Sequence, residues 1–487
     1  MKVLLLIPPE LYLIESYTSE KITKTREFRP KLGILCIAGY LRDKTGVVPV
    51  IIDCPTDGFT IDQIEGIIEK CNPDIVGMSV LTFNLLDCLE AANRIKHKNK
   101  NIKICFGGFH PTLYPRETCE LEPVDFVVIG EGEETFSELI MHLSSERMLS
   151  NIGEIDGLAW KDSDGTVIIN SPRNLIDDLD KLGLPAHDLI DISKYSHALS
   201  SGAYTAYIQT SRGCPFNCRF CDMRMTKFRS RSVEHVFHEI RVLLERGVKE
   251  IFFLDDTITV NKKRLISLCQ MLLHEKIKIK YKISSRVNTI DEEMLYYLKK
   301  SGCVRIHFGV ESGSQRILNT LQKGITIEQI IHAFDITKRS GMATYAYLMI
   351  GIPTETADDL TETLSLVRRI RPDYVTYSIC TPFPKTQMYQ DLLHEGYYRS
   401  DYWLEFAQNP TPSFKTQYAN EFFLPEQLRK IQDDVMAQFY SRSDFLFKEL
   451  IRTRSLKQLA RKIKLGYQLL FGYSRVRSGN RYPLKRQ

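Results

Sequence analysis

The feature that most constrains this chain is the alternation of short apolar, β-branched runs with segments of helical periodicity. Five such runs in the first 145 residues are predicted strands: Lys2–Ile7, Val47–Asp53, Asp74–Val80, Ile102–Phe106 and Asp125–Ile129. Four segments between and after them are predicted helices: Leu32–Asp43, Ile61–Cys71, Leu85–Lys96 and Glu133–Leu143. Continuous apolar strands separated by helices indicate an α/β fold whose parallel, Rossmann-like sheet is buried on both faces.

Ligands of such sheets bind in the loops beyond the carboxyl ends of the strands. We therefore predict a first site in Asp53, Ser79–Asn84, Gly107–Thr112 and Gly130–Glu133.

A second alternating series starts at Ala206. Its predicted strands lie near residues 206–210, 249–254, 280–286, 303–310, 343–350 and 373–379, with helices such as Val233–Glu245 and Thr326–Ser340. Six strand–helix units predict an open or partial barrel over residues 204–385. Residues 1–145 then form the first domain, and residues 146–203 form a connector with a hairpin at 157–169. Residues 386–487 form a C-terminal helical region, in which 425–439 and 456–470 are the predicted helices.

Length, composition and charge narrow the class of protein. A chain of 487 residues corresponds to about three domains and is too long for a peptide hormone or a single small module. The opening apolar run ends at Pro8, too early for a signal peptide, so we expect a cytoplasmic protein with reduced thiols. From Arg452 onward there are 11 basic and no acidic residues, against 54 basic and 60 acidic before it. Nucleic acid is therefore not expected as the main partner of the body.

The basic tail from Ile451 to Leu470 has the spacing of an amphipathic helix. We favour a solvated helix packed on the barrel. The functional alternatives are docking on a membrane surface, contact with an acidic partner, or weak contact with RNA.

Three cysteines, Cys214, Cys218 and Cys221, lie within eight residues directly after the first strand of the second series. Buried thiols or a zinc site are the simpler interpretations. Structural zinc, however, prefers a fourth thiolate or imidazole, and no second knuckle follows. Three thiolates suit a 4Fe-4S cluster that leaves one iron for a small molecule.

With these cysteines the chain resembles the radical S-adenosylmethionine superfamily, whose cysteine loop follows the first strand of a partial (β/α)6 barrel. The segments Phe252–Thr257, Ser284–Asn288, Phe308–Gly313 and Ile350–Glu355 follow in the order of that superfamily's strand-end motifs. In the first half, Gly107–Thr112 and Ile129–Glu133 resemble the corrinoid loops of its cobalamin-binding branch. The resemblance covers about residues 1 to 385.

The resemblance implies that S-adenosylmethionine binds to the open iron and to side chains at the strand ends. Asp255 and Asp256 would accept from its ammonium group, and Ser285 and Arg286 would meet its carboxylate or ribose. Glu311 would bond the ribose or groups beside the sulfonium, and Phe220 would pack near the adenine. For each acid the simpler interpretation is a helix cap or a solvated loop end.

For cobalamin, the resemblance implies close backbone approach of the macrocycle at glycines and hydrogen bonds to its amides from hydroxyl groups. The candidate residues are Ser79, Thr82, Gly107, Gly108, His110, Gly130 and Glu131. The DxHxxG pattern of proteins that supply a histidine to cobalt is absent. For His110, which lies in a Gly-Gly-Phe-His-Pro turn sequence, a turn role is at least as well supported as ligation of the cobalt, and we expect no protein histidine on the cobalt.

The activity that the resemblance implies is radical methylation at an unactivated carbon. A 5′-deoxyadenosyl radical would take a hydrogen atom from substrate, and methylcobalamin would supply the methyl group. The substrate would be a small or lipid-like molecule rather than a small polar metabolite, and a flavodoxin or ferredoxin would supply electrons. Residues 381–412 could line its pocket or pack against the tail.

Three alternatives stay open. An oxidative cyclase would share the architecture without methyl transfer. A methylthiotransferase acting on tRNA would use a second cluster on Cys36, Cys71 and Cys105, although Cys105 falls within a predicted strand. A corrinoid-binding sensor would lack catalysis. The cysteines outside the 214–221 motif otherwise fit small buried residues.

Overall fold

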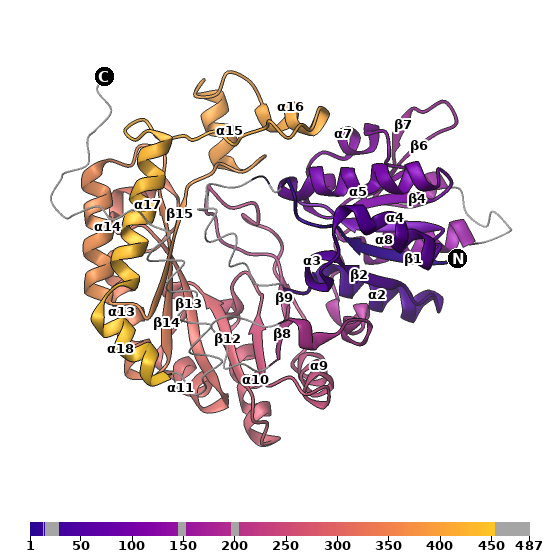
Figure 1. Cartoon of the computed structure of the whole chain (residues 1–487). Coiled ribbons are helices and arrows are strands. Elements are labelled where there is room, and N and C mark those ends of the chain that lie inside the picture. The colour runs from indigo at the N-terminus through magenta and orange to yellow at the C-terminus, as the bar shows by residue number, and fades with distance from the viewer. Residues whose placement is uncertain (13, 15–28, 145–151, 196–203, 453–487) are drawn as a thin grey trace. The chain divides into compact units, whose positions relative to one another are not determined.

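The computed structural model describes residues 1–12, 14, 29–144, 152–195 and 204–452. These residues form two compact units, shown in Figure 1. The first takes its described residues from 1–15, 28–195 and 398–416, and the second takes its described residues from 196–397 and 417–487. None of the described helices is both long and apolar enough to cross a membrane.

The first unit is built on a seven-stranded sheet in the order β2-β1-β3-β4-β5-β6-β7. The first five of these strands are parallel, and β6 and β7 are antiparallel additions. The strands are β1 (Val3–Ile7), β2 (Val50–Asp53), β3 (Ile75–Ser79), β4 (Lys103–Gly107), β5 (Phe126–Val128), β6 (Leu158–Lys161) and β7 (Val167–Ile169). The predicted parallel sheet is confirmed.

Helices cover both faces of this sheet because its strands are apolar on both sides. On one face α4 (Ile64–Cys71), α5 (Leu85–Lys98) and α7 (Pro115–Glu120) contribute to a core with Leu4 and Leu6. On the other, α2 (Leu32–Thr45) and α8 (Gly132–Ser144) pack with Val3 and Leu5. The short helices α3 (Cys54–Asp57) and α6 (Phe109–Leu113) follow β2 and β4. Successive side chains of β1 therefore point alternately into two separate hydrophobic cores.

The compact units differ from the predicted division at two places. The hairpin of the expected connector pairs through β6 with β5, so residues 152–195 extend the first unit. The segment 398–416 also groups with the first unit: Trp403 of α16 (Tyr402–Gln408) is fully buried, and its ring lies 6.4 Å from that of Phe83. These aromatic side chains of the expected pocket segment pack against the first unit.

The second unit contains a six-stranded parallel sheet in the order β15-β14-β13-β12-β11-β8, the predicted partial barrel. The strands are β8 (Thr205–Ile208), β11 (Glu250–Phe253), β12 (Lys280–Ser285), β13 (Cys303–Glu311), β14 (Ala343–Ile350) and β15 (Tyr374–Ile379). A small antiparallel pair, β9 (Ser211–Arg212) and β10 (Arg229–Ser230), brackets the cysteine motif. The helices are α9 (Val233–Glu245), α10 (Lys262–His274), α11 (Glu292–Ser301), α12 (Gln315–Thr320), α13 (Ile327–Arg339), α14 (Ala357–Ile370), α15 (Gln387–His394), α17 (Pro425–Tyr440) and α18 (Ser443–Arg452).

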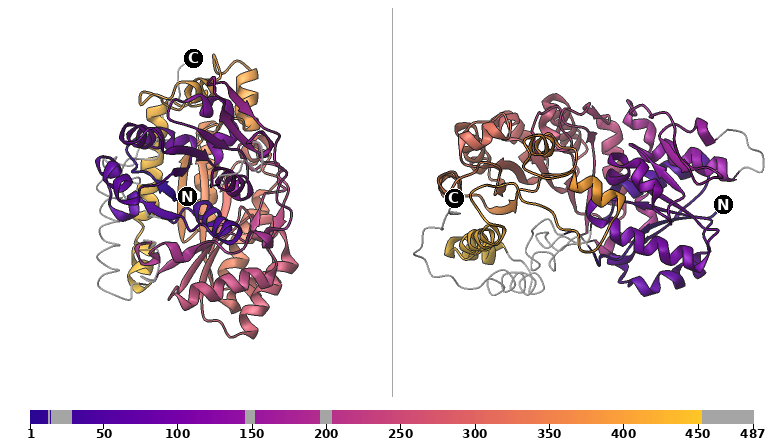
Figure 2. Two further views of the ribbon diagram at one scale, coloured as in Figure 1. Left: turned by 90° about the vertical axis from the view of Figure 1, so that its right-hand side faces the viewer. Right: turned by 90° about the horizontal axis from the view of Figure 1, so that it is seen from above.

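Helix α17 covers the open edge of this sheet. It runs beside β15 in Figures 1 and 2. The Tyr440 hydroxyl accepts from the Val375 amide at 3.2 Å and donates to the Val375 carbonyl at 2.6 Å, and Gln432 donates to the Tyr377 carbonyl at 2.7 Å. An edge strand otherwise presents unpaired backbone groups, so these side chains complete the ladder that the partial barrel leaves open. The predicted helix at 425–439 is confirmed, whereas residues 456–470 lie outside the described residues.

Candidate functional site

The three cysteines of the motif lie on one loop that follows β8. Gly213, just before Cys214, has a φ of +87°, and a Cβ there would overlap the Lys227 carbonyl, so only glycine lets the two ends of the loop meet. The Cys214 amide donates to Thr226 Oγ1 at 2.8 Å, and the Cys221 amide donates to the Cys218 carbonyl at 3.2 Å. The loop thus holds the three thiols by its own backbone.

Arg286 lies against this loop. Its Nη1 donates to the Cys218 sulfur at 3.2 Å, and its guanidinium stacks 3.9 Å from the centre of the Phe216 ring. Burial raises the pKa of the Cys214 thiol and raises that of Cys221 to about 12. These thiols therefore need a bound cation to become thiolates, and a neighbouring guanidinium favours sulfur in that form. Three free thiols with a cationic neighbour fit a cluster held by three cysteines.

The two aspartates after β11 have different surroundings. Asp255 is buried, and its carboxylate accepts from the Thr210 amide at 3.1 Å, from the Thr210 hydroxyl at 2.7 Å and from the Ser211 hydroxyl. Asp256 is exposed. Asp255 therefore anchors the start of the cysteine loop. Burial, together with the nearby carboxyl groups of Asp255 and Asp222, raises the pKa of Asp256 to about 6, so its carboxyl group is partly desolvated although the residue is exposed.

Ser285 ends β12 among hydroxyl groups. It is buried and shares a hydrogen bond of 2.8 Å with Thr259. Its hydroxyl also donates to the Arg286 carbonyl at 3.0 Å. Ser285 thus fixes the backbone from which Arg286 extends.

Glu311 at the end of β13 forms a buried ion pair that the sequence analysis missed. Lys323 Nζ lies 2.8 Å from Glu311 Oε1, and the two side chains are 7% and 11% exposed. The same ammonium lies 5.6 Å from the centre of the Phe220 ring. A Cβ on Gly309 would approach Glu311 Oε1 to 2.7 Å, so this glycine leaves room for the pair. A buried carboxylate is costly without a partner, but no local spacing in the sequence indicated Lys323.

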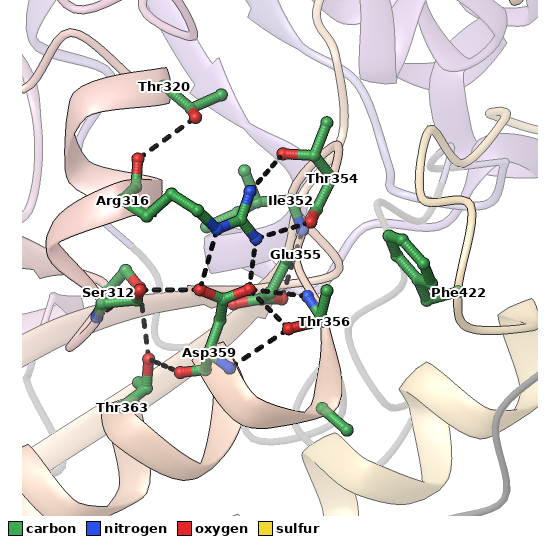
Figure 3. A network of polar contacts seen from close by, with 12 residues as sticks. Ser312, Arg316, Thr320, Ile352, Thr354, Glu355, Thr356, Asp359, Thr363 and Phe422 are labelled. Carbon is green, nitrogen blue, oxygen red and sulfur yellow. Dashed lines mark hydrogen bonds and ion pairs between the residues drawn. The ribbon is translucent and has the colours of Figure 1, made fainter.

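A polar network joins the segments that follow β13 and β14 (Figure 3). Arg316 pairs with Asp359, which also accepts from Ser314 at 2.7 Å. Although burial acts in the opposite direction, hydrogen bonds from Arg316, Ser314 and Thr356 hold the pKa of Asp359 below its ordinary value. Buried Glu355 accepts from the Gly351 amide at 2.6 Å, and burial raises its pKa to about 8. These hydrogen bonds and the ion pair fix the loops that follow β13 and β14.

In the first unit, the loops after β3 and β4 meet at Gly108. Its φ and ψ of 104° and −159° belong to a region that only glycine enters readily, and a Cβ would lie 3.0 Å from the Val80 carbonyl. Gly107 ends β4 opposite Ser79, and Ser79 Oγ would lie 3.2 Å from a Cβ on Gly108. At the carboxyl ends of β3 and β4 the two glycines therefore present backbone atoms and no side chains.

The remaining predicted residues of this edge make contacts within the first unit. His110 is fully buried and shares a hydrogen bond of 3.1 Å with Thr82, which agrees with a turn role. Glu131 accepts from the Ile176 amide at 2.9 Å. Gly130 has a φ of +77° with open space where a Cβ would stand. An open glycine and an exposed backbone fit the close approach of a flat macrocycle.

The comparisons with known proteins find a family model in each half of the chain. Residues 22–140 match the family model of the B12 binding domain, and residues 208–367 match that of the radical SAM superfamily. A Pyrococcus horikoshii protein named as an uncharacterized methyltransferase is 35% identical over 92% of this chain and 95% of its own length. The chain belongs to the cobalamin-binding radical S-adenosylmethionine enzymes. Its cofactors are accordingly a 4Fe-4S cluster, S-adenosylmethionine and cobalamin.

Two further comparisons bear on this radical S-adenosylmethionine enzyme. The anaerobic magnesium-protoporphyrin IX monomethyl ester cyclase of Rubrivivax gelatinosus is 29% identical over 74% of this chain and 66% of its own. The solved structure of the radical enzyme OxsB with aqua-cobalamin and S-adenosylmethionine bound is similar with a TM-score of 0.72. That likeness covers 96% of this chain and 71% of OxsB at 20% identity, which supports the fold.

Two cysteines of the alternative second cluster lie on opposite sides of the first sheet in this radical S-adenosylmethionine enzyme. Cys71 packs with the core on the α4 and α5 side of the first sheet. Cys105, within β4, belongs to the core on the opposite side. A buried sheet therefore separates two of the three candidate ligands, which argues against the methylthiotransferase alternative.

Gly108→Ala is expected to lower the free energy of unfolding by about 2 to 3 kcal/mol, because the new Cβ adds backbone strain and a contact with Val80. Gly130→Ala is the matched control, since it adds strain at a positive φ in open space. Its cost should be about 1 kcal/mol. Denaturant unfolding of both variants measures the difference. Equal costs would contradict the close approach at Gly108.

Proposed function

We propose that this chain is a cobalamin-dependent radical methyltransferase that acts at an unactivated carbon of a small or lipid-like substrate. The observation that carries the proposal is the match, over 92% of this chain and 95% of the relative, with the Pyrococcus horikoshii protein named as a methyltransferase. Both cofactor domains lie within that match. When bound, the cofactors supply a radical that removes a hydrogen atom and a methyl group that replaces it.

In this proposal Cys214, Cys218 and Cys221 ligate the 4Fe-4S cluster. Arg286 stabilises the Cys218 sulfur as an anion, because its Nη1 already donates to that atom. Asp255 holds the loop through Thr210 and Ser211 rather than meeting the ligand.

S-adenosylmethionine would be oriented by outward-facing groups near this loop. Asp256 is the aspartate available to its ammonium group, since the carboxylate of Asp255 already accepts from Thr210 and Ser211. Glu311, held by its ion pair with Lys323, would accept from the ribose, and Phe220 would pack near the adenine. Ser285 positions Arg286 through the backbone between them.

Cobalamin would be held at the carboxyl edge of the first sheet. Gly107, Gly108 and Gly130 offer backbone to the macrocycle, and Ser79 offers a hydroxyl to its amides. Thr82 and Glu131 position the edge through the contacts described above. Because His110 is buried against Thr82, we propose that no protein histidine reaches the cobalt.

The proposed partners are the substrate and a one-electron donor such as flavodoxin or ferredoxin. We also propose a cytoplasmic location. Peripheral membrane contact through the basic tail is a further proposal, and that tail from residue 453 lies outside the described residues.

A cyclase without methyl transfer is the second candidate, favoured by the 29% identity to the Rubrivivax gelatinosus cyclase. Anaerobic reconstitution with iron, sulfide and cobalamin separates the two. For a methyltransferase we expect about four irons and one cobalt per chain. After reduction with S-adenosylmethionine, methylation of the cobalamin itself should release about one equivalent of S-adenosylhomocysteine without substrate.

Mass spectrometry measures S-adenosylhomocysteine and 5′-deoxyadenosine in the same samples. 5′-Deoxyadenosine without S-adenosylhomocysteine, at full cobalt loading, would contradict methyl transfer and favour the cyclase. Absence of cobalt would overturn both candidates.

A further inference from the structure

The inner face of the partial barrel carries a layer of charged side chains. Phe308 of β13 packs on Phe334 of α13, so the alternation of the strand puts Arg305 and His307 on the opposite, inner face. Arg305 pairs in register with Lys282 of β12, which forms an ion pair with Glu250 of β11. This layer therefore holds two basic side chains and one acidic side chain.

Arg305 has no counterion in the described part of the chain. It is 3% exposed, and its Nε and Nη2 are buried without a hydrogen-bond partner. The guanidinium carbon of Arg305 lies over the Tyr374 ring, 4.8 Å from its centre. A buried guanidinium with five donors is normally bonded to carboxylate or phosphate oxygens, because leaving it alone is costly.

The inner face next to Arg305 is aromatic, and it opens toward the carboxyl ends of the strands. The Tyr345 ring stacks on His307 at 4.6 Å, and the Tyr347 hydroxyl shares a hydrogen bond of 2.9 Å with His307 Nδ1. Tyr347 is 37% exposed and Ser378 is exposed. Rings of this kind bind an apolar or unsaturated body, while their hydroxyls meet its polar groups.

We propose that Arg305 binds the anionic end of the substrate, a carboxylate or a phosphate, and that the tyrosines of the inner face hold the body of that molecule. Arg305 lies six residues before Glu311 on β13, which corresponds to roughly 20 Å of strand. The substrate is then an elongated acid whose reacting carbon lies at the carboxyl edge, far from its anionic group. This substrate class rests on the proposed function, whereas the anion site itself does not.

Thermal unfolding of the anaerobically reconstituted holoenzyme tests the site without turnover. The probes are 4-phenylbutyrate, phenyl phosphate and the neutral amide 4-phenylbutyramide. At saturating concentration the matching anion should raise the unfolding midpoint of the wild type by about 3 °C or more. A shift with phenylbutyrate alone assigns a carboxylate, a shift with phenyl phosphate alone assigns a phosphate, and the amide should give none.

Arg305→Met should abolish the shift, and without any probe it should unfold at or above the wild-type temperature because it removes an unpartnered buried charge. Lys280→Met, which removes an exposed cation of the same sheet, is the control and should keep the shift. If Arg305→Met fails to fold, Arg305→Lys replaces it and should shift less than the wild type, since it lacks the planar fork.

No anion shift in the wild type, or an equal shift in Arg305→Met, would overturn the proposal. An anion shift in a protein that forms no S-adenosylhomocysteine would contradict the methyltransferase and leave the anion site standing. Formation of S-adenosylhomocysteine without an anion shift would contradict the anion site alone and leave the methyltransferase proposal standing.

Discussion

Cys218→Ser is expected to abolish iron binding and to reduce 5′-deoxyadenosine formation at least 100-fold, to background. Cys218 is the most buried thiol of the motif, at 6% exposed, and its sulfur accepts from Arg286. A serine hydroxyl stays protonated where a thiol would ionise onto iron, so the loop would retain two of its three thiolate ligands. Iron analysis and the absorbance of the cluster after anaerobic reconstitution measure the loss directly.

Cys71→Ser is the matched control, because Cys71 is a partly exposed thiol on α4 of the first unit. It should keep the full iron content and the full rate of S-adenosylmethionine cleavage. Loss of about half the iron in this variant would instead indicate a second cluster and revive the methylthiotransferase alternative. Full iron in Cys218→Ser would contradict the assignment of the motif.

The architecture was predictable because its signals are local. Apolar runs and helical periodicity are properties of a few consecutive residues, and the helix Val233–Glu245 is observed with its predicted bounds. Its Ser232 side chain accepts from the His235 amide, a cap that the sequence itself carries. Strand order in the barrel then follows from right-handed connections between consecutive parallel strands.

The differences all depend on pairing between distant residues. The hairpin of β6 and β7 was predicted, yet its addition to the first sheet depends on Phe126 facing Trp160. The aromatic residues near Trp403 could have lined a pocket on sequence grounds. Their contact with Phe83 joins segments more than 300 residues apart, for which no periodicity gives a signal.

Within the candidate site, sequence could name the residues at the strand ends but could not rank them. Asp255 and Asp256 are adjacent and chemically identical, and only burial with bonds from Thr210 separates the anchor from the exposed carboxylate. Arg286 was expected to meet a ligand carboxylate or ribose, and the structure adds the Cys218 sulfur as its contact. Such distinctions need the fold, because they depend on which side chain turns inward.

Lys323→Met is expected to destabilise the second unit by about 3 to 5 kcal/mol. The Lys323 ammonium lies 2.8 Å from the Glu311 carboxylate, and both side chains are largely shielded from water. Removing the ammonium therefore leaves a carboxylate without its counter-charge in a poorly solvated place. Methionine preserves most of the apolar stem, which keeps the packing term small. Denaturant unfolding, monitored through the transition of the second unit, measures the change in its free energy of unfolding.

The double variant Lys323→Met with Glu311→Gln separates charge from packing. It should recover most of the lost stability, because the uncompensated carboxylate is gone, while binding of S-adenosylmethionine should stay weaker than in the wild type. Lys262→Met is the control: its pair with Asp291 is solvent-exposed, so its loss should cost less than about 1 kcal/mol. If the double variant were as unstable as Lys323→Met, the lysine would act through its stem rather than its charge. The Glu311 carboxylate would then not depend on the charge of Lys323, and the proposed part of this ion pair in binding the ribose would be contradicted.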